Sequence, residues 1–240
     1  GTTTGSGTGK AYSYSVNTTS GFSIIKYVGN GTAGHTIPHH LGVTADFVIV
    51  KALGNTESWQ VISKAMDADK FIQLDSNNSE ISQGSYNMFN STRPNSTVVT
   101  LGNQNHTNQN GTDYIMYAFA EKTGYSKFSS YYGNENAEGP FVYTGFKPAF
   151  VIFKKLTGST QHWVMMDTKR DPYNVMDTRL YPSQNNADTT NAAYYVDYLS
   201  NGFKIRTNSI SWNASGVKYI FMAFAEKPLV GSNNTPCTAR

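Results

Sequence analysis

The chain has 240 residues and a formal net charge of +3, and only 15% of its residues are charged, against roughly 25% in an average soluble domain. Aromatic residues make up 13%, with 16 Tyr and 13 Phe. This composition excludes a coiled coil, which needs abundant Ala, Glu, Lys and Leu, and a disordered chain, which has few aromatics and a high net charge. Because Lys and Arg are scattered and no run of 18 or more apolar residues occurs, we expect neither nucleic-acid binding nor membrane insertion.

The predicted elements begin after residues 1–20, which are rich in Gly, Thr and Ser and are expected to form a leader or linker. Short runs rich in Val, Ile, Phe, Tyr and Thr then predict β-strands, because Gly, Asn, Asp, Ser and Pro clusters suited to turns separate them. These runs are 22–28, 46–51, 58–63, 71–75, 97–101, 113–121, 141–144, 149–155, 162–166, 202–207 and 218–226. A helical period is seen only in the short segment 63–69.

Three sequence blocks recur in the same order at nearly one spacing. The segment 114–122 (YIMYAFAEK) returns 105 positions later, and 47–51 (FVIVK) returns 103 positions later as FVIFK. Trp59 returns as Trp163. A period near 100 residues has the size of a whole small domain, so we predict two homologous domains at 21–122 and 123–230, followed by a polar tail at 231–240. The expected fold is all-β, two tandem antiparallel β-sandwiches of jelly-roll type.

Two motifs at the end of the first predicted strand suggest ligands. Residues 29–34 match the G-x-G-x-x-G dinucleotide pattern, but Pro38 follows where a helix would have to start, so these glycines indicate a hairpin loop. His35, His39 and His40 form the one histidine cluster, and a metal site there is the alternative to a polar loop between strands. We expect neither a metal nor a cofactor.

Catalytic patterns are weak. Asp67 with Asp69, and Glu135 with Glu138, are carboxylate pairs of the kind a glycosidase uses, but both pairs lie in loop-like stretches. The single cysteine, Cys237, lies in the tail and cannot form a disulfide within the chain. We therefore expect a protein without enzymatic activity, with a polysaccharide-degrading enzyme as one alternative.

Aromatic residues are the candidate ligand-binding groups. Trp59 and Trp163 hold equivalent places in the two repeats, which predicts a core position for both. Adjacent aromatics in a strand face opposite sides, so one of each pair should point outward and could stack on a sugar or a partner protein. The candidates for such a surface are Tyr131, Tyr132, Tyr194, Tyr195, Tyr198 and Trp212.

Several segments together resemble an uncharacterised repeat domain common in virion proteins of tailed phages, especially marine and cyanobacterial phages. The segments that carry the resemblance are 21–27, 39–43, 46–51, 124–128, 139–148, 170–174, 199–204 and the AFAE strand ends at 118–121 and 223–226. The resemblance as a whole covers nearly all of residues 20–240. One departure is Ala45, which stands before Asp46 where a proline is usual.

This resemblance implies a structural protein of the virion, in a tail fibre or tail tip, that serves assembly or host attachment. It implies a location on the particle surface and a homo-oligomer such as a trimer, with other virion proteins and a host-surface glycan or protein as partners. It supplies no catalytic residues. The alternatives are a carbohydrate-binding surface module and a head-decoration or filament-forming protein.

Overall fold

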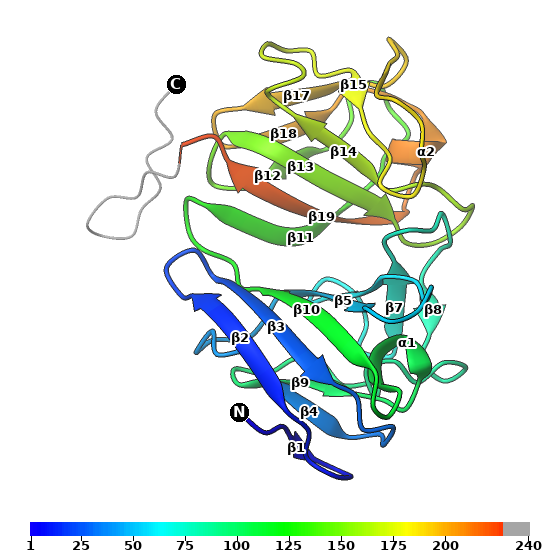
Figure 1. The fold of residues 1–240 in the computed structure, drawn as a ribbon. Helices are drawn as coiled ribbons and strands as arrows, with labels where there is room; N and C mark the ends of the chain where they lie inside the picture. Colours follow the sequence, from blue (N-terminus) through cyan, green and yellow to red (C-terminus); the bar gives the residue numbers. More distant parts are fainter. Residues whose placement is uncertain (228–240) are drawn as a thin grey trace. The chain divides into compact units, whose positions relative to one another are not determined.

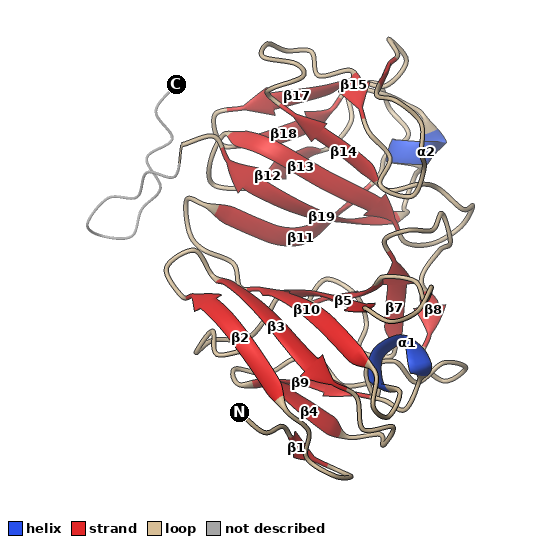
Figure 2. Ribbon diagram, in the orientation of Figure 1, coloured by secondary structure: helices blue, strands red, loops and turns tan. Residues whose placement is uncertain are grey.

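The structure is a computed structural model that describes residues 1–227. Almost all of its regular structure is β-strand, with two one-turn helices (Figure 2). The chain divides into two compact units (Figure 1). The first unit holds residues 1–75 and 80–121, and the second holds residues 76–79 with the chain from residue 122 onward.

The first unit is a sandwich of two antiparallel sheets. Its strands and helix are β1 (Thr4–Gly5), β2 (Tyr12–Asn17), β3 (Phe22–Val28), β4 (His35–Pro38), β5 (Phe47–Ala52), β6 (Gln60–Ser63), β7 (Lys70–Gln73), β8 (Ile81–Ser82), β9 (Val98–Leu101), α1 (Asn105–Asn108) and β10 (Asp113–Phe119). The large sheet has the order β2-β3-β10-β5-β6-β7-β8, and the small sheet has the order β1-β4-β9. Sequence-distant β3 and β5 thus flank β10 at the centre.

Alternation along the central strands builds the core of this unit. In β3, Ile25 and Tyr27 are buried while Lys26 between them is exposed. Tyr27 lies opposite Tyr114 of β10, so the two strands turn the same face inward. These residues join one buried cluster with Val99 of the small sheet, which shows that the core lies between the two sheets.

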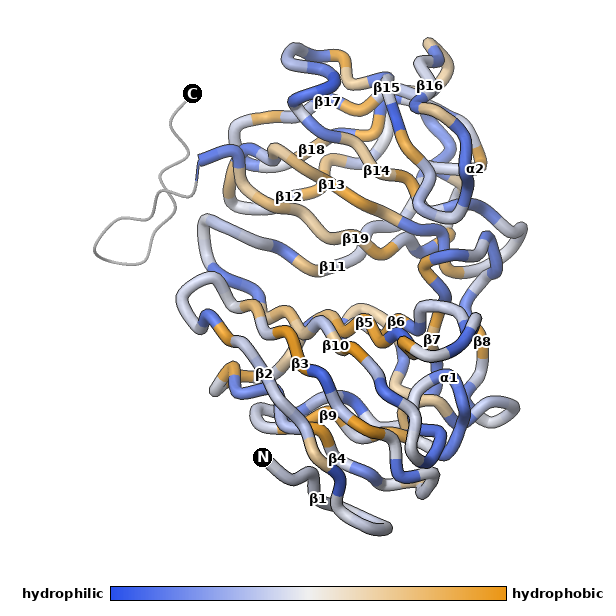
Figure 3. Tube along the Cα trace, in the orientation of Figure 1, coloured by the Kyte–Doolittle hydropathy of each residue, from blue (hydrophilic) through white to orange (hydrophobic). Residues whose placement is uncertain are grey.

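The second unit repeats this plan. Its elements are β11 (Ser126–Tyr132), β12 (Phe141–Tyr143), β13 (Pro148–Lys155), β14 (Val164–Asp167), β15 (Thr178–Arg179), β16 (Thr189–Thr190), β17 (Val196–Leu199), β18 (Gly202–Ile205), α2 (Ile210–Asn213) and β19 (Lys218–Ala225). One sheet has the order β11-β19-β13-β14, a second has β12-β18-β17, and β15 pairs with β16. The central strands of both units are among their most hydrophobic segments (Figure 3).

The core of the second unit also draws on both of its main sheets. Tyr131 of β11 lies opposite Tyr219 of β19, as Tyr27 lies opposite Tyr114 in the first unit. Phe203 of β18 joins the same buried cluster. The all-β fold with two antiparallel sandwiches, expected from the sequence, is therefore what the structure shows, and the predicted boundary at residues 122 and 123 lies within one residue of the boundary between the units.

Three local predictions are wrong. Residues 1–20 are not a linker, because β1 pairs with β4 and β2 pairs with β3. His35–Pro38 is strand β4 rather than loop, since His35 and Ile37 alternate inward. Residues 64–69 form turns and extended chain instead of a helix. The predicted tail at 231–240, with Cys237, lies outside the described residues.

Among residues 1–227, neither helix has the length and hydropathy needed to cross a membrane.

Candidate functional site: an aromatic and basic pocket in the second unit

A buried asparagine fixes the short helix of each unit. Asn213, the last residue of α2, accepts a hydrogen bond at Oδ1 from the Asn134 backbone N–H at 2.8 Å. Its Nδ2 donates to the carbonyls of Thr207 and Asn136, both at 2.8 Å. The Tyr219 hydroxyl accepts from the Ala214 N–H at 3.0 Å. These bonds satisfy the end of a helix too short to be stable alone, and they hold α2 in place.

The first unit has the same arrangement around α1. Asn108 accepts at Oδ1 from the Asn30 N–H at 2.9 Å and donates to the Gly102 carbonyl at 2.6 Å. Tyr27 donates its hydroxyl to the carbonyl of Thr107, as Tyr131 does to the carbonyl of Trp212. Trp212 therefore stands where the first unit has Thr107, which indicates that the two units share one frame and differ in the side chains it carries.

A pocket of about 180 Å³ lies beside α2 in the second unit. Strands β13 and β14 and the loops before β14, after β15 and before β17 supply the rest of its wall. The pocket is lined by Phe153, Lys155, Gln161, His162, Val164, Tyr181, Gln184, Tyr194, Ser211 and Trp212. Its volume lies below the roughly 300 Å³ at which pockets for drug-sized ligands begin, so it suits one ring rather than an extended chain.

Aromatic rings form one wall of this pocket. The centroid of the Tyr194 ring lies 5.0 Å from that of Trp212, and Phe153 meets Trp212 edge to face at 5.1 Å. Trp212 is buried, whereas Tyr194 and Tyr181 are half-buried. The rings of Tyr181 and His162 meet edge to face, with their centroids 5.9 Å apart. The partly accessible tyrosine rings offer apolar faces on which a flat or ring-shaped ligand can stack.

Polar side chains, Gln184 and His162 among them, line the same pocket. The amide Nε2 of Gln184 lies 2.9 Å from Nε2 of His162, and Nδ1 of His162 lies 2.7 Å from the Ser183 hydroxyl. Burial, and secondarily the charge of Lys154, lower the pKa of His162. His162 is therefore neutral at pH 7, accepting from Gln184 at Nε2 and donating to Ser183 from Nδ1.

One cation, Lys155, lines the pocket, and a second, Arg179, packs against the rings that line it. Lys155 is buried, and its ammonium donates to the Ser159 hydroxyl at 3.0 Å and to the Ile210 carbonyl at 3.1 Å. Burial lowers the pKa of Lys155. Arg179 packs against the aromatic wall, with its guanidinium carbon 4.6 Å from the Tyr194 ring centroid and 5.6 Å from that of Trp212. Its Nε donates to the Tyr181 hydroxyl.

The structure places the six predicted aromatic residues in different settings. Tyr194 and Trp212 line the pocket, and Tyr198 lines a second pocket of about 150 Å³ that Lys147 and Met176 also line. The expectation of an exposed surface is wrong for Tyr131, Tyr198 and Trp212, which are buried.

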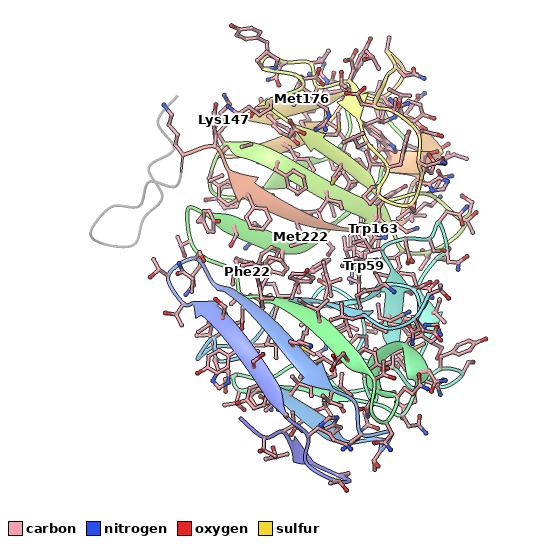
Figure 4. All side chains as sticks on the ribbon, in the orientation of Figure 1. Phe22, Trp59, Lys147, Trp163, Met176 and Met222 are labelled. Carbon is pink, nitrogen blue, oxygen red and sulfur yellow. The ribbon has the colours of Figure 1, made fainter. Side chains whose placement is uncertain are left out.

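The inward residues are buried for a physical reason. Tyr131 and Tyr198 project from strands into the core, and each donates its hydroxyl to a buried backbone carbonyl, of Trp212 and Met166 respectively. Tyr132, next to Tyr131 in the same strand, is 59% exposed, and Tyr195 is half-buried. Of the two tryptophans expected in the core, Trp163 is buried and Trp59 is half-buried (Figure 4).

Sequence reasoning missed most of the pocket. Lys155, His162, Tyr181 and Gln184 did not stand out, because the pocket residues come from separate elements between positions 153 and 212. The one available signal was that Trp212 has no aromatic counterpart in the first repeat. That difference pointed to a property present in only one unit, although not to the groups around it.

The three histidines of the predicted cluster do not converge. His35 bonds Asn108 Oδ1 at 2.8 Å and Thr3 Oγ1 at 2.6 Å, and His39 bonds the Asn95 carbonyl at 3.0 Å. His40 bonds the Tyr12 hydroxyl at 2.9 Å. Across residues 1–227, no group of three His, Cys, Asp or Glu side chains is placed to hold a metal ion. Each of these histidines instead has a separate hydrogen-bonding partner in the first unit.

The carboxylates singled out in the sequence also have other partners. Glu138 forms ion pairs with Lys204 at 2.7 Å and Arg206 at 3.0 Å, and these cations lower its pKa. Asp69 pairs with Lys70 at 3.1 Å. Glu135 has a left-handed backbone with φ of 54°, so it belongs to a turn. These acids are surface groups in turns and ion pairs.

A family model, that of the domain of unknown function DUF7483, matches residues 1–228 and so spans both units. No curated protein and no solved structure matches the chain. The chain belongs to the DUF7483 family.

Proposed function

We propose that this member of the DUF7483 family is a structural protein of a tailed-phage virion, without enzymatic activity, in a tail fibre or tail tip, where it serves assembly or host attachment. The motif resemblance described above supports the phage assignment. The frame supports a structural role, because two sandwiches with helix ends fixed by buried asparagines give a rigid base for exposed loops.

The observation that carries host attachment is the pocket beside α2. Partly accessible tyrosine rings next to hydrogen-bonding and cationic groups are the combination that binds small polar rings, and loops on a rigid frame build this wall. The same observation favours a second candidate, a carbohydrate-binding surface module that is not part of a virion.

Location in particles tests the proposal. Purified particles made by the phage genome that encodes the chain would be labelled with gold-conjugated antibody against the chain and imaged by electron microscopy. We expect gold along the tail fibres or at the tail tip. Gold over the shell would instead identify a head-decoration protein, and particles without the chain would leave the surface module as the better candidate.

The expected assembly is a homo-oligomer, such as a trimer, because virion components are usually symmetric. Light scattering on the purified chain measures this state. A mass three times that of one chain is the expected result, and a monomer at all concentrations would contradict the trimer.

A further inference from the structure

The pocket beside α2 is basic. Within the described part of the chain, residues 1–227, Lys155 is its one charged lining residue, and neither Asp nor Glu is among the residues that line it. Two hydrogen bonds, to Ser159 and Ile210, occupy two of the three N–H groups of the Lys155 ammonium. Among residues 1–227 the third N–H has no acceptor, so it can donate to a ligand. His162 is neutral and contributes no charge. An anionic group that enters this pocket therefore meets the Lys155 cation and no negative side chain among the lining residues.

Arg179 gives a second, independent sign of a missing acceptor. Its side chain is 95% buried, and within residues 1–227 its Nη1 has no hydrogen-bond partner. A buried guanidinium N–H without an acceptor loses its hydration and gains no bond in return, which is unfavourable. The guanidinium lies against Tyr181, Tyr194 and Trp212, all of which line the pocket. The positive charge of the Arg179 guanidinium also attracts an anionic group that lies near these rings.

We propose that this pocket binds a single acidic sugar residue, of the hexuronate or sialate class, from a glycan on the host surface. The pyranose ring stacks on Tyr194 and Tyr181, and its carboxylate accepts hydrogen bonds from Lys155 and, after a small shift of the side chain, from Arg179. The ring hydroxyls meet Gln161, Gln184 and Ser211. Host attachment as the purpose of this binding rests on the function proposed above, whereas the binding itself does not.

The volume and the groups present fit this ligand better than a larger or an apolar one. About 180 Å³ accommodates one ring, while the rest of a glycan chain extends into solvent. A charge-assisted hydrogen bond from Lys155 is about twice as strong as a neutral one, so the carboxylate should dominate selectivity. A neutral hexose offers the same ring face without that bond, which makes it the matched comparison.

Calorimetric titration of the purified 240-residue chain tests the proposal. Methyl β-D-glucuronide and methyl β-D-glucoside differ only in a carboxylate against a hydroxymethyl group, and N-acetylneuraminate and inorganic phosphate complete the set. We expect at least one acidic sugar to bind with millimolar or tighter affinity. The affinities for the glucoside and for phosphate should be lower than that by about tenfold or more. The proposal would be overturned if neither acidic sugar bound more tightly than the glucoside, if phosphate alone bound, or if no probe bound.

Two variants assign the binding to the pocket. Lys155→Met keeps the apolar stem and should weaken binding of the acidic sugar about tenfold or more, with no change for the glucoside. Tyr194→Ala should weaken both sugars, because it removes the stacking face. Lys169→Met and Tyr132→Ala change exposed residues outside the pocket and should leave both affinities as they are.

Folding of each variant is checked by near-ultraviolet circular dichroism. If Lys155→Met fails to fold, Tyr194→Ala and Lys155→Arg carry the test, because Lys155→Arg retains the charge and should retain preference for the acid. Unchanged affinity in the folded pocket variants would overturn the proposal. If no sugar binds, the virion location proposed above is unaffected. If the chain is absent from particles, the sugar binding proposed here is unaffected, so the two proposals can fail separately.

Discussion

Replacing Asn213 by alanine should destabilise the second unit severely. The variant removes the acceptor for the Asn134 N–H and the donors to the carbonyls of Thr207 and Asn136. Thr207 is buried, so leaving its carbonyl without a donor costs about 1–3 kcal/mol. Asn134 and Asn136 are exposed and water can replace the lost partner, so losing each of these two hydrogen bonds costs about 0.5–1.5 kcal/mol. The free energy of unfolding should fall by about 2–6 kcal/mol, and the melting temperature by at least about 8 °C.

Guanidinium unfolding followed by tryptophan fluorescence measures this loss. In a Trp59→Phe background the remaining tryptophans, Trp163 and Trp212, both report on the second unit. The control is Asn185→Ala, at an exposed position, which should change stability by no more than about 0.5 kcal/mol. Asn213→Asp retains the shape but loses the donors, and should also destabilise. A loss below about 1 kcal/mol in Asn213→Ala, or full tolerance of Asn213→Asp, would refute the reasoning.

Two further predictions concern backbone packing and alkaline pH. Gly133→Ala should cost several kcal/mol, because a Cβ there would lie 2.3 Å from the Ala214 carbonyl oxygen, whereas Gly54→Ala meets no atom within 4 Å and should be tolerated; chemical denaturation compares the two. Burial raises the pKa of Tyr114 and of Tyr219 to about 12, above the value near 10 in the unfolded chain. The unfolded chain therefore loses these protons first, so stability is complete below pH 10 and falls as the pH rises towards 12. Unfolding experiments across this pH range should show that the free energy of unfolding falls, and that it falls less in Tyr219→Phe. A free energy of unfolding that does not change with pH would contradict the assignment.

The central strands were predictable because their sequence signal is strong. The segments that recur, at 114–122 and 219–227 and at 47–51 and 150–154, contain the strands at the centre of each large sheet, where long apolar runs are needed on structural grounds. The recurrence also predicted two units, because each of two domains with the same fold needs its own set of similar core residues.

The edges of the first sandwich were not predictable from composition. In β2, Tyr12 and Val16 pack against the core while Tyr14 is exposed, yet Gly, Ser and Thr around them indicate a linker. The pairing that makes this segment a strand comes from β3, which lies outside it. Composition describes what a segment could do alone, whereas an edge strand is stabilised by its neighbour.

The pocket could not be predicted because proximity in it is created by the fold. Aromatic candidates were identified by type, but type cannot decide which of Tyr131 and Tyr132 faces inward, since either register buries one ring. Lys155 carries no mark in the sequence that separates it from Lys154. Only the packing of β13 against α2 and the loops distinguishes the lysine that lines the pocket from its neighbour.

The bond that joins each core tyrosine to its short helix ends on a main-chain oxygen, at Thr107 in one unit and at Trp212 in the other. Since any amino acid supplies that oxygen, this bond does not fix the identity of the side chain at this point. The two units fill the position differently: Thr107 donates its hydroxyl to the Met88 carbonyl at 2.9 Å, whereas Trp212 packs against Phe153 and Tyr194. The second unit thereby carries a buried indole in the wall of the pocket beside α2, where the first unit carries a small hydroxyl side chain.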